Sequence, residues 1–382
     1  MQRILPMHPS VTRPNSMDID LDALELNLAL VRRCIRPGVA VIASVKANAY
    51  GHGIVLVGRR LAAAGVEVLA TGSFSDAVAL RKAGIVTPIL MMGGALPAAI
   101  PELLRHDLIP TAHNQELIEA VAASAARRAL IYIKVDCGLG RLGIPLREAH
   151  RFVLAAARNP HLEIAGLYTH LPFADEAGRE WARDRITKFE ELVSALAKDG
   201  LLIPVTQARA SAALLTGIED RCTAVSPGGL LYGLAPVNPG LADTSALRPV
   251  MACVRTCIIQ VSPAALDRTP GCESRYAGLV TGATGVVPFG RVDGNRAPIA
   301  GKGAHMLVDG VKAPILGVSL EHAVLDLSAL PRPAVGREVV VLGRSGQSMI
   351  TVADIARWQG VGANDVLMSL NERVPQSVLP GP

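Results

Sequence analysis

The amino-acid sequence predicts a (β/α)8 TIM barrel followed by a mostly β C-terminal domain. Short β-rich runs occur eight times before about residue 240, and segments with helical periodicity separate most of them. Apolar runs that alternate with helices are typical of parallel strands buried on both faces. After residue 240 the pattern changes to short alternating runs with turn residues at close intervals, which indicates a second, mostly β domain.

The eight predicted strands follow one another along the first two thirds of the chain. They are residues 41–46, 67–72, 88–93, 108–113, 130–136, 164–170, 204–210 and 224–233. Eight such strand–helix units in roughly 240 residues are the pattern of a (β/α)8 barrel.

The predicted helices lie between these strands, and several end at a glycine, as helices often do. They are residues 53–65, 75–84, 114–128, 146–158 and 175–200, and an opening helix at 18–35 precedes the first strand. Their apolar residues recur with the period of an α-helix, which predicts one buried face on each.

The C-terminal third contains many turn signals. The runs SP, TPG, DGN, PRPAVG and GRSGQ interrupt short alternating segments, and one short helix is predicted at 351–360. We place the domain boundary within residues 237–249. This gives a barrel domain at 11–240 and a β domain at 241–382, with residues 1–10 as a candidate addition to the β domain.

The composition is that of a globular protein and argues against several function classes. Half of the 382 residues are hydrophobic, and the net charge of +5 is scattered, with no block of like charge that would bind nucleic acid. The N-terminus lacks an apolar stretch of signal-peptide length, and no apolar run is long enough to span a bilayer, so we expect a cytoplasmic protein. The six cysteines show no CxxC spacing, and we expect no metal site.

Chemistry-bearing residues collect where the predicted strands end, which is the catalytic face of such barrels. Lys46 and Tyr50 follow the first strand, and later strand ends supply Arg141, His170, Arg209, Ser211, Ser226, Gly228 and Gly229. A lysine that apolar neighbours desolvate keeps a neutral amine and can form a Schiff base with an aldehyde. Glycines after the last strand expose backbone N–H groups that bind phosphate. The combination indicates pyridoxal 5'-phosphate, abbreviated PLP.

Several segments also resemble one enzyme family. Residues 40–53, AVIASVKANAYGHG, are similar to the cofactor-lysine motif of the alanine racemases, which are fold-type III PLP-dependent enzymes. The similarity continues in the same order through IDLDALELNL, KVDCGLGRLG, GLYTHLPFADE, ASAALL, SPGGLLYG, VVPFGRVDG and AVLDLSALPRPAVGREVVVLG, and it covers residues 16–375. The resemblance implies an isomerase that produces D-amino acids as a head-to-tail homodimer, with each active site completed by the partner's β domain.

The resemblance also implies roles for individual residues. Lys46 would carry the cofactor and act as a base on one face of the substrate Cα, and Arg141, with Lys134 behind it, would support the cofactor's ring oxygen. His170 would lie against the ring. The remaining cofactor contacts would be Tyr50, Ser211, Ser226, Gly228, Gly229 and Asn364, and the substrate contacts would be Arg291, Leu320 and Glu321.

The chain departs from the family pattern at several positions. The second proton carrier of the family is a tyrosine in the partner's β domain, and Tyr276 is the candidate here, although it lies a few residues too late in the sequence. Ser226 replaces an arginine that keeps the cofactor's ring nitrogen unprotonated, and Gln207 replaces the histidine that supports this arginine. Arg291 replaces a tyrosine and could bind a second substrate carboxylate.

These departures leave several functions open. The first is a racemase that acts on a small amino acid. The alternatives are a PLP-dependent lyase or aldolase, a one-base epimerase, and a catalytically degenerate homologue that binds PLP or an amino acid. Arg141 could also serve only as an ion-pair partner of Asp136.

Overall fold

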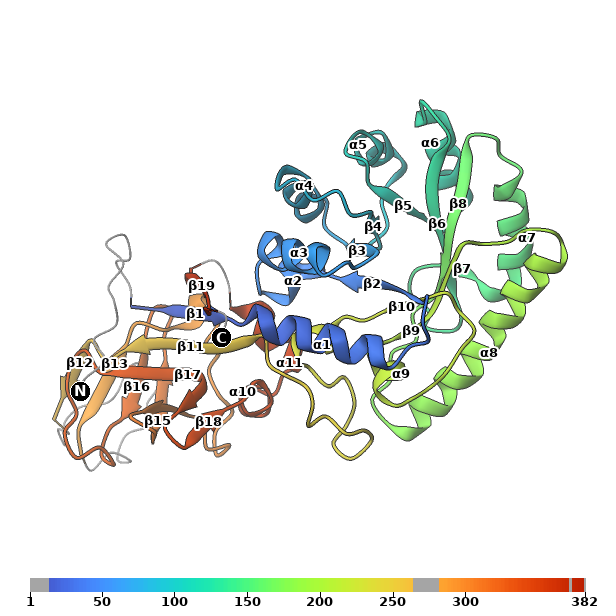
Figure 1. Ribbon diagram of the computed structural model, residues 1–382. Helices are drawn as coiled ribbons and strands as arrows, with labels where there is room; N and C mark the ends of the chain where they lie inside the picture. The colour runs from blue at the N-terminus through green and yellow to red at the C-terminus, as the bar shows by residue number, and fades with distance from the viewer. Residues whose placement is uncertain (1–13, 264–281, 371–372, 381–382) are drawn as a thin grey trace. The chain divides into compact units, whose positions relative to one another are not determined.

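The computed structural model describes residues 14–263, 282–370 and 373–380 (Figure 1). Its contacts divide the chain into two compact units. Leu21–Pro249 is here called the barrel unit, and Met1–Asp20 together with Val250–Pro382 is called the β unit. The boundary predicted after residue 240 lies in a stretch, 234–250, that carries neither helix nor strand.

Eight parallel strands form a closed ring in the barrel unit, all of whose residues the structure describes. In ring order they are β2 (Ala40–Ser44), β3 (Val68–Thr71), β4 (Ile89–Met91), β5 (Ile109–Ala112), β6 (Ala129–Asp136), β8 (Leu162–Tyr168), β9 (Val205–Ala210) and β10 (Ala224–Ser226). The pairing of β10 with β2 closes the ring. The predicted barrel is therefore confirmed.

Helices connect the barrel strands, and Figure 1 shows α4, α5, α6 and α8 on their outer side. The longer helices are α1 (Leu21–Arg33), α3 (Ile54–Ala63), α4 (Phe74–Lys82), α6 (Gln115–Ser124), α7 (Leu146–Ala157) and α8 (Glu176–Lys198). The short elements are α2 (Lys46–Tyr50), η1 (Pro97–Ala99), α5 (Ile100–Arg105), β7 (Ile144–Pro145), α9 (Ser211–Leu215) and η2 (Gly229–Tyr232). Side-chain oxygens of Ser73, Asn114 and Asp175 cap α4, α6 and α8, because the first N–H groups of a helix lack partners within it.

The structure corrects two predicted elements near the barrel and adds two short helices. The last strand ends at Ser226 rather than at residue 233, because Pro227 has no N–H to donate to a ladder and Gly228 leads into η2. The opening helix begins at Leu21, not at residue 18. The sequence predicts neither α5 nor α9, since helices of six and five residues are too short to show a clear period.

Side chains fill the interior of the barrel. One cluster joins Ile42, Val68, Leu90, Tyr132 and Tyr168, none of which is more than 6% exposed. Full burial of such a side chain contributes roughly 1.5–3 kcal/mol to stability. The interior is thus a packed core that holds the strand ends in fixed positions.

The described residues of the β unit form an extended, mostly antiparallel sheet. Its order is β12-β13-β16-β15-β14-β17-β11-β1-β19, with β18 beside β17, and of these pairings the β1–β19 pairing is parallel. The strands are β1 (Ser16–Ile19), β11 (Met251–Cys257), β12 (Gln260–Ser262), β13 (Thr284–Val287), β14 (His305–Val308), β15 (Val311–Val318), β16 (Ala323–Asp326), β17 (Glu338–Ser345), β18 (Ser348–Ile350) and β19 (Gln376–Val378). This confirms the mostly β C-terminal domain.

The remaining elements of the β unit are a short turn and two helices. They are η4 (Arg291–Asp293), α10 (Val352–Gln359) and α11 (Ala363–Ser369). α10 occupies the predicted helical segment, whereas α11 is an additional helix whose Asp365 accepts from the Gly362 N–H. Within the part of the chain that the structure describes, none of the helices combines the length and apolar character needed to cross a bilayer.

The N-terminal strand β1 belongs to the β unit, although its sequence was expected to open a helix. β1 pairs antiparallel with β11, and Asp18 Oδ2 lies 2.5 Å from Arg255 Nη2. Partners about 240 residues away in the sequence therefore override the local helical pattern, as tertiary contacts commonly do.

Candidate active site

Lys46 follows β2 and begins an unusual backbone turn. Ala47, Asn48, Ala49 and Tyr50 all have a positive φ, between 52° and 54°. Non-glycine residues in this left-handed region cost roughly 1–2 kcal/mol each, so surrounding contacts must hold the turn. We expected apolar neighbours to desolvate the Lys46 side chain. In the described chain it is exposed instead, because its neighbours Ala47 and Asn48 are exposed as well and do not cover it. Its Nζ lies 5.7 Å from the centroid of the Tyr50 ring.

Tyr50, Ser211 and Gly228 meet at one point of the barrel rim. Ser211 Oγ accepts hydrogen bonds from the Gly228 N–H at 2.9 Å and from the Leu230 N–H at 3.4 Å. A Cβ at position 228 would lie 2.4 Å from Tyr50 Oη, so any larger residue would force this hydroxyl to move. At Gly229 the nearest atom to such a Cβ would be 3.4 Å away. Hydroxyls and backbone amides gathered in this way are the groups with which proteins bind phosphate.

Three aromatic rings pack together beside this group. The Tyr232 ring centroid lies 4.6 Å from that of Tyr50 and 4.8 Å from that of His52. Tyr232 Oη donates to the Ser44 carbonyl at 3.1 Å, which ties the stack to the end of β2. Sequence reasoning assigns no role to Tyr232 or His52, although SPGGLLYG places Tyr232 four residues after Gly228 and KANAYGHG contains His52.

Basic side chains surround His170. Burial, followed by the charges of Lys46, Arg141 and Lys134, lowers the pKa of His170 to about 3. Lys134 is 6% exposed, with its Nζ 5.3 Å from the centroid of the Tyr168 ring. Burial, followed by the charges of Arg141 and Lys46, lowers the pKa of Lys134 to about 8. The charges of Lys46 and Arg141 thus lower the pKa values of both His170 and Lys134, which shows that the four side chains belong to one cluster. Its net positive charge attracts anions.

Asp136 organises the loop that carries Arg141. Its Oδ1 accepts from the N–H groups of Gly138 and Leu139 at 2.9 Å and 2.8 Å, and its Oδ2 accepts from the Gly140 N–H at 2.9 Å. The carboxylate therefore bonds to the loop backbone. This arrangement differs from the side-chain ion pair between Asp136 and Arg141 that the sequence left open.

Arg209 has a structural role, unlike the other predicted rim residues. Its Nε lies 2.9 Å from Asp220 Oδ1, and both side chains are almost fully buried. The ion pair joins β9 to the segment before β10. Arg209 lies two residues before Ser211, so the pair also stabilises the position of Ser211. Gln207 Nε2 donates to the Arg209 carbonyl at 3.0 Å, and Ser226 ends β10 opposite Ala210 of β9.

The predicted substrate residues lie together in the β unit. Arg291, Leu320 and Glu321 are exposed. Arg291 Nη2 donates to the carbonyl of Val318, and Arg373 Nη2 lies 2.9 Å from Glu321 Oε2. Leu320 and Glu321 lie in the turn between β15 and β16, and the Arg291 N–H donates to the Ser319 carbonyl of this turn at 3.0 Å. The three residues are therefore close together, with Glu321 already in an ion pair.

Two further predicted residues belong to the C-terminal part of the chain. Asn364 is exposed in the first turn of α11. Tyr276, the candidate second proton carrier, lies outside the described residues.

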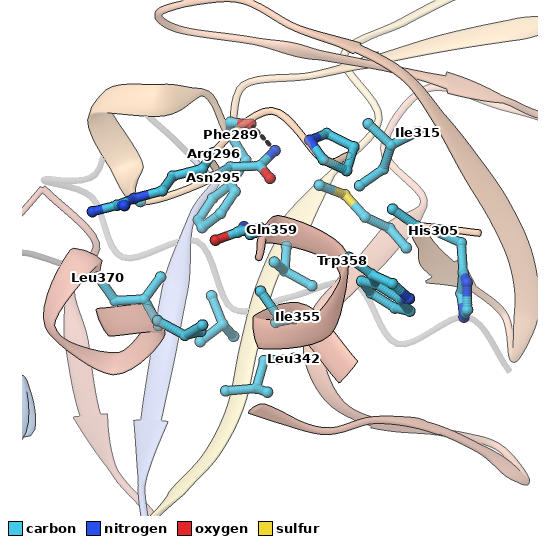
Figure 2. Close-up of a pocket in the computed structure, with 17 residues that line it drawn as sticks. Phe289, Asn295, Arg296, His305, Ile315, Leu342, Ile355, Trp358, Gln359 and Leu370 are labelled. Carbon is cyan, nitrogen blue, oxygen red and sulfur yellow. Dashed lines mark hydrogen bonds between the residues drawn. The ribbon is translucent and has the colours of Figure 1, made fainter. Parts of the chain in front are cut away.

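A separate pocket lies inside the β unit (Figure 2). Phe289, Met306, Ile355 and Trp358 are among the residues that line it, and the buried Gln359 Oε1 has no hydrogen-bond partner within the described residues. Its volume is about 30 Å³, which is room for about two water molecules. The pocket is too small for PLP, so the barrel rim is the candidate site.

The residues at the rim fit PLP. Lys46 supplies a primary amine near Tyr50, and Tyr50, Ser211 and Gly228 form a compact group of hydroxyls and backbone amides. The positive charges of Lys134 and Arg141 can balance an anionic ring oxygen and a phosphate. A Cβ at position 228 would occupy the space beside the Tyr50 hydroxyl, which agrees with a cofactor contact at this glycine.

Comparison with known proteins shows the family. The model of the alanine racemase N-terminal domain matches residues 19–236, and that of the C-terminal domain matches residues 251–378. The alanine racemase of Halothermothrix orenii is 32% identical over 374 residues, which are 97% of this chain and 98% of that protein. The alanine racemase of Syntrophobacter fumaroxidans is 31% identical over 358 residues, 93% of this chain and 94% of that protein.

Solved structures agree with these matches. The crystal structure of alanine racemase from E. faecalis superposes with a TM-score of 0.89 at 26% identity, and the alignment covers 98% of this chain and 100% of that chain. Alanine racemase from the D-cycloserine producer Streptomyces lavendulae gives a TM-score of 0.87 at 28% identity, covering 97% and 98%. The racemase prediction is thereby supported over the lyase, aldolase, epimerase and degenerate alternatives. The chain belongs to the alanine racemase family and is a PLP-dependent amino-acid racemase.

Proposed function

We propose that the rim of the barrel unit is the active site, that Lys46 is its cofactor lysine, and that alanine or a similarly small amino acid is the substrate. The meeting of Tyr50, Ser211 and Gly228 close to the Lys46 amine carries the proposal. The names of the relatives support alanine as the substrate.

Bound PLP supplies an aldehyde that condenses with amines and a ring that delocalises the negative charge left on Cα. Lys46 Nζ takes the proton from one face of Cα and can return it there. Arg141 and Lys134 would place positive charge where it can balance the cofactor's anionic ring oxygen. Because the pKa of His170 is about 3, its imidazole is neutral at physiological pH and offers the ring an uncharged contact.

A second group of residues would hold the phosphate. Tyr50 Oη, Ser211 Oγ and the backbone of Gly228 and Gly229 would orient it, and the Arg209–Asp220 ion pair would keep Ser211 in place. Ser226 and Asn364 are the remaining proposed cofactor contacts. Anchoring the phosphate keeps the reacting carbon within reach of Lys46, which lowers the entropy cost of proton transfer.

Racemisation also needs a proton carrier on the face opposite Lys46, and we assign it to Tyr276 of the partner subunit in a homodimer. The partner's β unit would also present Arg291, Leu320 and Glu321 to the substrate. The exposure of Lys46 supports this arrangement, as do the exposed apolar side chains of Phe74 (37%) and Leu96 (76%), which follow β3 and β4. Exposed apolar groups at a rim are typical of surfaces that a partner covers.

We also propose that the protein is cytoplasmic and that its domains divide within residues 237–249. The five cysteines in the described part of the chain are free thiols, which fits a reducing compartment. The lack of helix and strand between residues 234 and 250 fits the domain boundary.

Isotope exchange tests the reaction. The purified chain is loaded with PLP and incubated with L-alanine in D2O, and we expect deuterium at Cα of both enantiomers. Deuterium in one enantiomer only, or accumulation of an aldehyde, would contradict the proposal.

Mixed variants test the shared active site. Lys46→Ala and Tyr276→Phe chains are each inactive on their own in this proposal. A random heterodimer restores one of its two sites, so mixing after subunit exchange should recover about a quarter of the wild-type activity. No recovery would argue against a site built from two subunits.

A further inference from the structure

The turn that carries Lys46 is strained, and several hydrogen bonds oppose the strain. Four consecutive non-glycine residues, 47–50, adopt the left-handed conformation. Within the backbone, the Ala49 N–H donates to Val45 at 3.0 Å and the Gly51 N–H donates to Ala47 at 3.1 Å. The strained conformation persists because the surrounding structure specifies it.

Side chains hold the turn from two directions. Asp76 of α4 accepts from the Asn48 N–H at 3.2 Å, and Asn48 Oδ1 accepts from the Ile54 N–H at 2.7 Å. The Ala49 carbonyl, which is buried, lies 2.9 Å from His52 Nδ1 and also accepts from the His52 N–H at 3.0 Å. His52, two residues after the turn, is thus bonded twice to the Ala49 carbonyl.

His52 is an unusual choice for this position. Its side chain is fully buried, and its Nε2 has no hydrogen-bond partner within the described residues. A carbonyl can only accept, so Nδ1 carries the proton and Nε2 is left as a buried acceptor. An apolar ring could pack on Tyr232 equally well without this unpaired nitrogen. The donor at Nδ1 is therefore the property of histidine that the site uses.

We propose that His52 is a positioning residue, and that its Nδ1–H bond to the Ala49 carbonyl fixes the left-handed turn and thereby the Lys46 amine relative to the phosphate contacts at Tyr50 and Gly228. The inference rests on the proposed role of Lys46. Tyr50 is both the last residue of the turn and the partner of Tyr232 in the ring stack, so a shift of the turn moves the amine and the phosphate contact together.

Two substitutions separate the donor from the ring. His52→Asn keeps an N–H donor near the position of Nδ1 but removes the ring, whereas His52→Phe keeps a ring and removes the donor. His150, a partly exposed histidine of α7 whose Nε2 lies 2.8 Å from Asp199, supplies matched controls as His150→Asn and His150→Phe.

The variants are compared by amide hydrogen exchange at Ala49, Gly51 and Gly53 in the protein without cofactor, and by the rate at which PLP dissociates. Loss of one hydrogen bond corresponds to about a 2- to 12-fold change in an opening equilibrium. We expect His52→Phe to raise both rates by about this factor, His52→Asn to stay near wild type, and both His150 variants to leave them unchanged.

The opposite ranking, with His52→Asn impaired and His52→Phe normal, would show that His52 only packs and would overturn the proposal. Equal impairment of both would overturn it as well. If His52→Phe does not fold, His52→Asn decides alone, because the proposal requires it to keep the turn and the cofactor. If the wild-type chain bound no PLP, the proposed function would be wrong. The amide hydrogen-exchange rates would still test whether the His52 hydrogen bond stabilises the turn.

Discussion

The barrel unit and the β unit present their functional residues in different ways. At the barrel rim, Gly228 bonds to Ser211 and lies beside the Tyr50 hydroxyl, although the three residues come from three different strand ends. In the β unit, Glu321 already pairs with Arg373, and Arg291 bonds to the Val318 carbonyl beside the exposed turn between β15 and β16. The proposed phosphate contacts Tyr50, Ser211 and Gly228 thus all belong to one unit, whereas the proposed substrate residues of the β unit would need a partner's surface to act on.

The difference has a physical cause. Closing eight parallel strands into a ring brings their carboxyl ends together whatever the loop sequences are, so a cofactor site can form there from one chain. A turn between two antiparallel strands, such as the one between β15 and β16, collects no such set of ends. Changes at the rim should therefore affect cofactor binding strongly, and changes at this β-unit turn should affect stability and cofactor binding little.

The largest effect is expected from Lys46→Ala. It removes the proposed base and cofactor amine, so kcat should fall by at least about 10³-fold, near the upper part of the range for losing one acid–base group. The variant should keep its fold, because the Lys46 side chain is exposed. Steady-state kinetics and circular dichroism check both points.

Lys188→Ala, which removes a half-exposed lysine of α8, is the control and should behave as wild type. Substantial activity in Lys46→Ala would place the chemistry elsewhere.

The next largest effect is expected from Gly228→Ala. Its Cβ would lie 2.4 Å from Tyr50 Oη, so the hydroxyl must move. Overpacking of this kind costs typically 1–3 kcal/mol, which would raise the Kd for PLP by roughly 5- to 150-fold. Gly229→Ala is the matched control, because its Cβ would be 3.4 Å from the nearest atom. PLP titration followed by absorbance measures both, and equal affinities would show that the contact at residue 228 does not shape the site.

A smaller effect is expected from pH, through the buried histidine of the barrel unit. Burial lowers the pKa of His52 from 6.5 to about 4, so the folded state favours the neutral form. Between these values the unfolded chain binds more protons, and the free energy of unfolding therefore falls as the pH falls, by at most about 1.4 kcal/mol per unit. The contribution is fully present above pH 6.5.

Urea unfolding across this pH range measures the slope, with His52→Asn as the comparison. The variant should lose the part of the slope that His52 contributes. An identical pH dependence in both proteins would assign the acid sensitivity to other groups, such as His170, whose pKa is also lowered by burial and neighbouring charges.

The smallest effect is expected from Glu321→Gln in the β unit. Glu321 and Arg373 are each nearly half exposed, and exposed ion pairs contribute at most about 1 kcal/mol. We expect little change in the free energy of unfolding or in the Kd for PLP, and a change in KM rather than kcat if Glu321 faces the substrate. A fall in kcat as large as that of a rim variant would contradict the comparison between the two units.

Much of the fold could be predicted from sequence, because residues that are buried on one face of a helix or strand recur in the sequence with a regular period. Each of the eight barrel strands overlaps its predicted segment, and α3, α4, α6, α7 and α8 occupy the segments with helical period. The errors have a common cause. β1 and the end of β10 depend on long-range partners and on Pro227, and α5, α9 and α11 are too short to display a period.

The candidate site could be predicted only in part. Lys46, Tyr50, Ser211 and Gly228 follow predicted strands, and their convergence follows from the barrel. The exposure of Lys46 was not foreseen, nor were the roles of His52, Tyr232 and Asp76, since these depend on side-chain packing between segments that no local pattern connects. The assignments of Tyr276, Arg291 and Asn364 stay predictions.

The sequence by itself determined the order of strands and helices, the family and the positions of the motif residues, because hydrophobic period and short motifs are local properties. Only the tertiary structure decided that four residues after Lys46 adopt a left-handed turn, that Asp136 bonds to its own loop, and that His52 lies buried against Tyr232. Such details arise from the balance between backbone strain, burial and hydrogen bonds, and that balance exists only when distant segments are packed together.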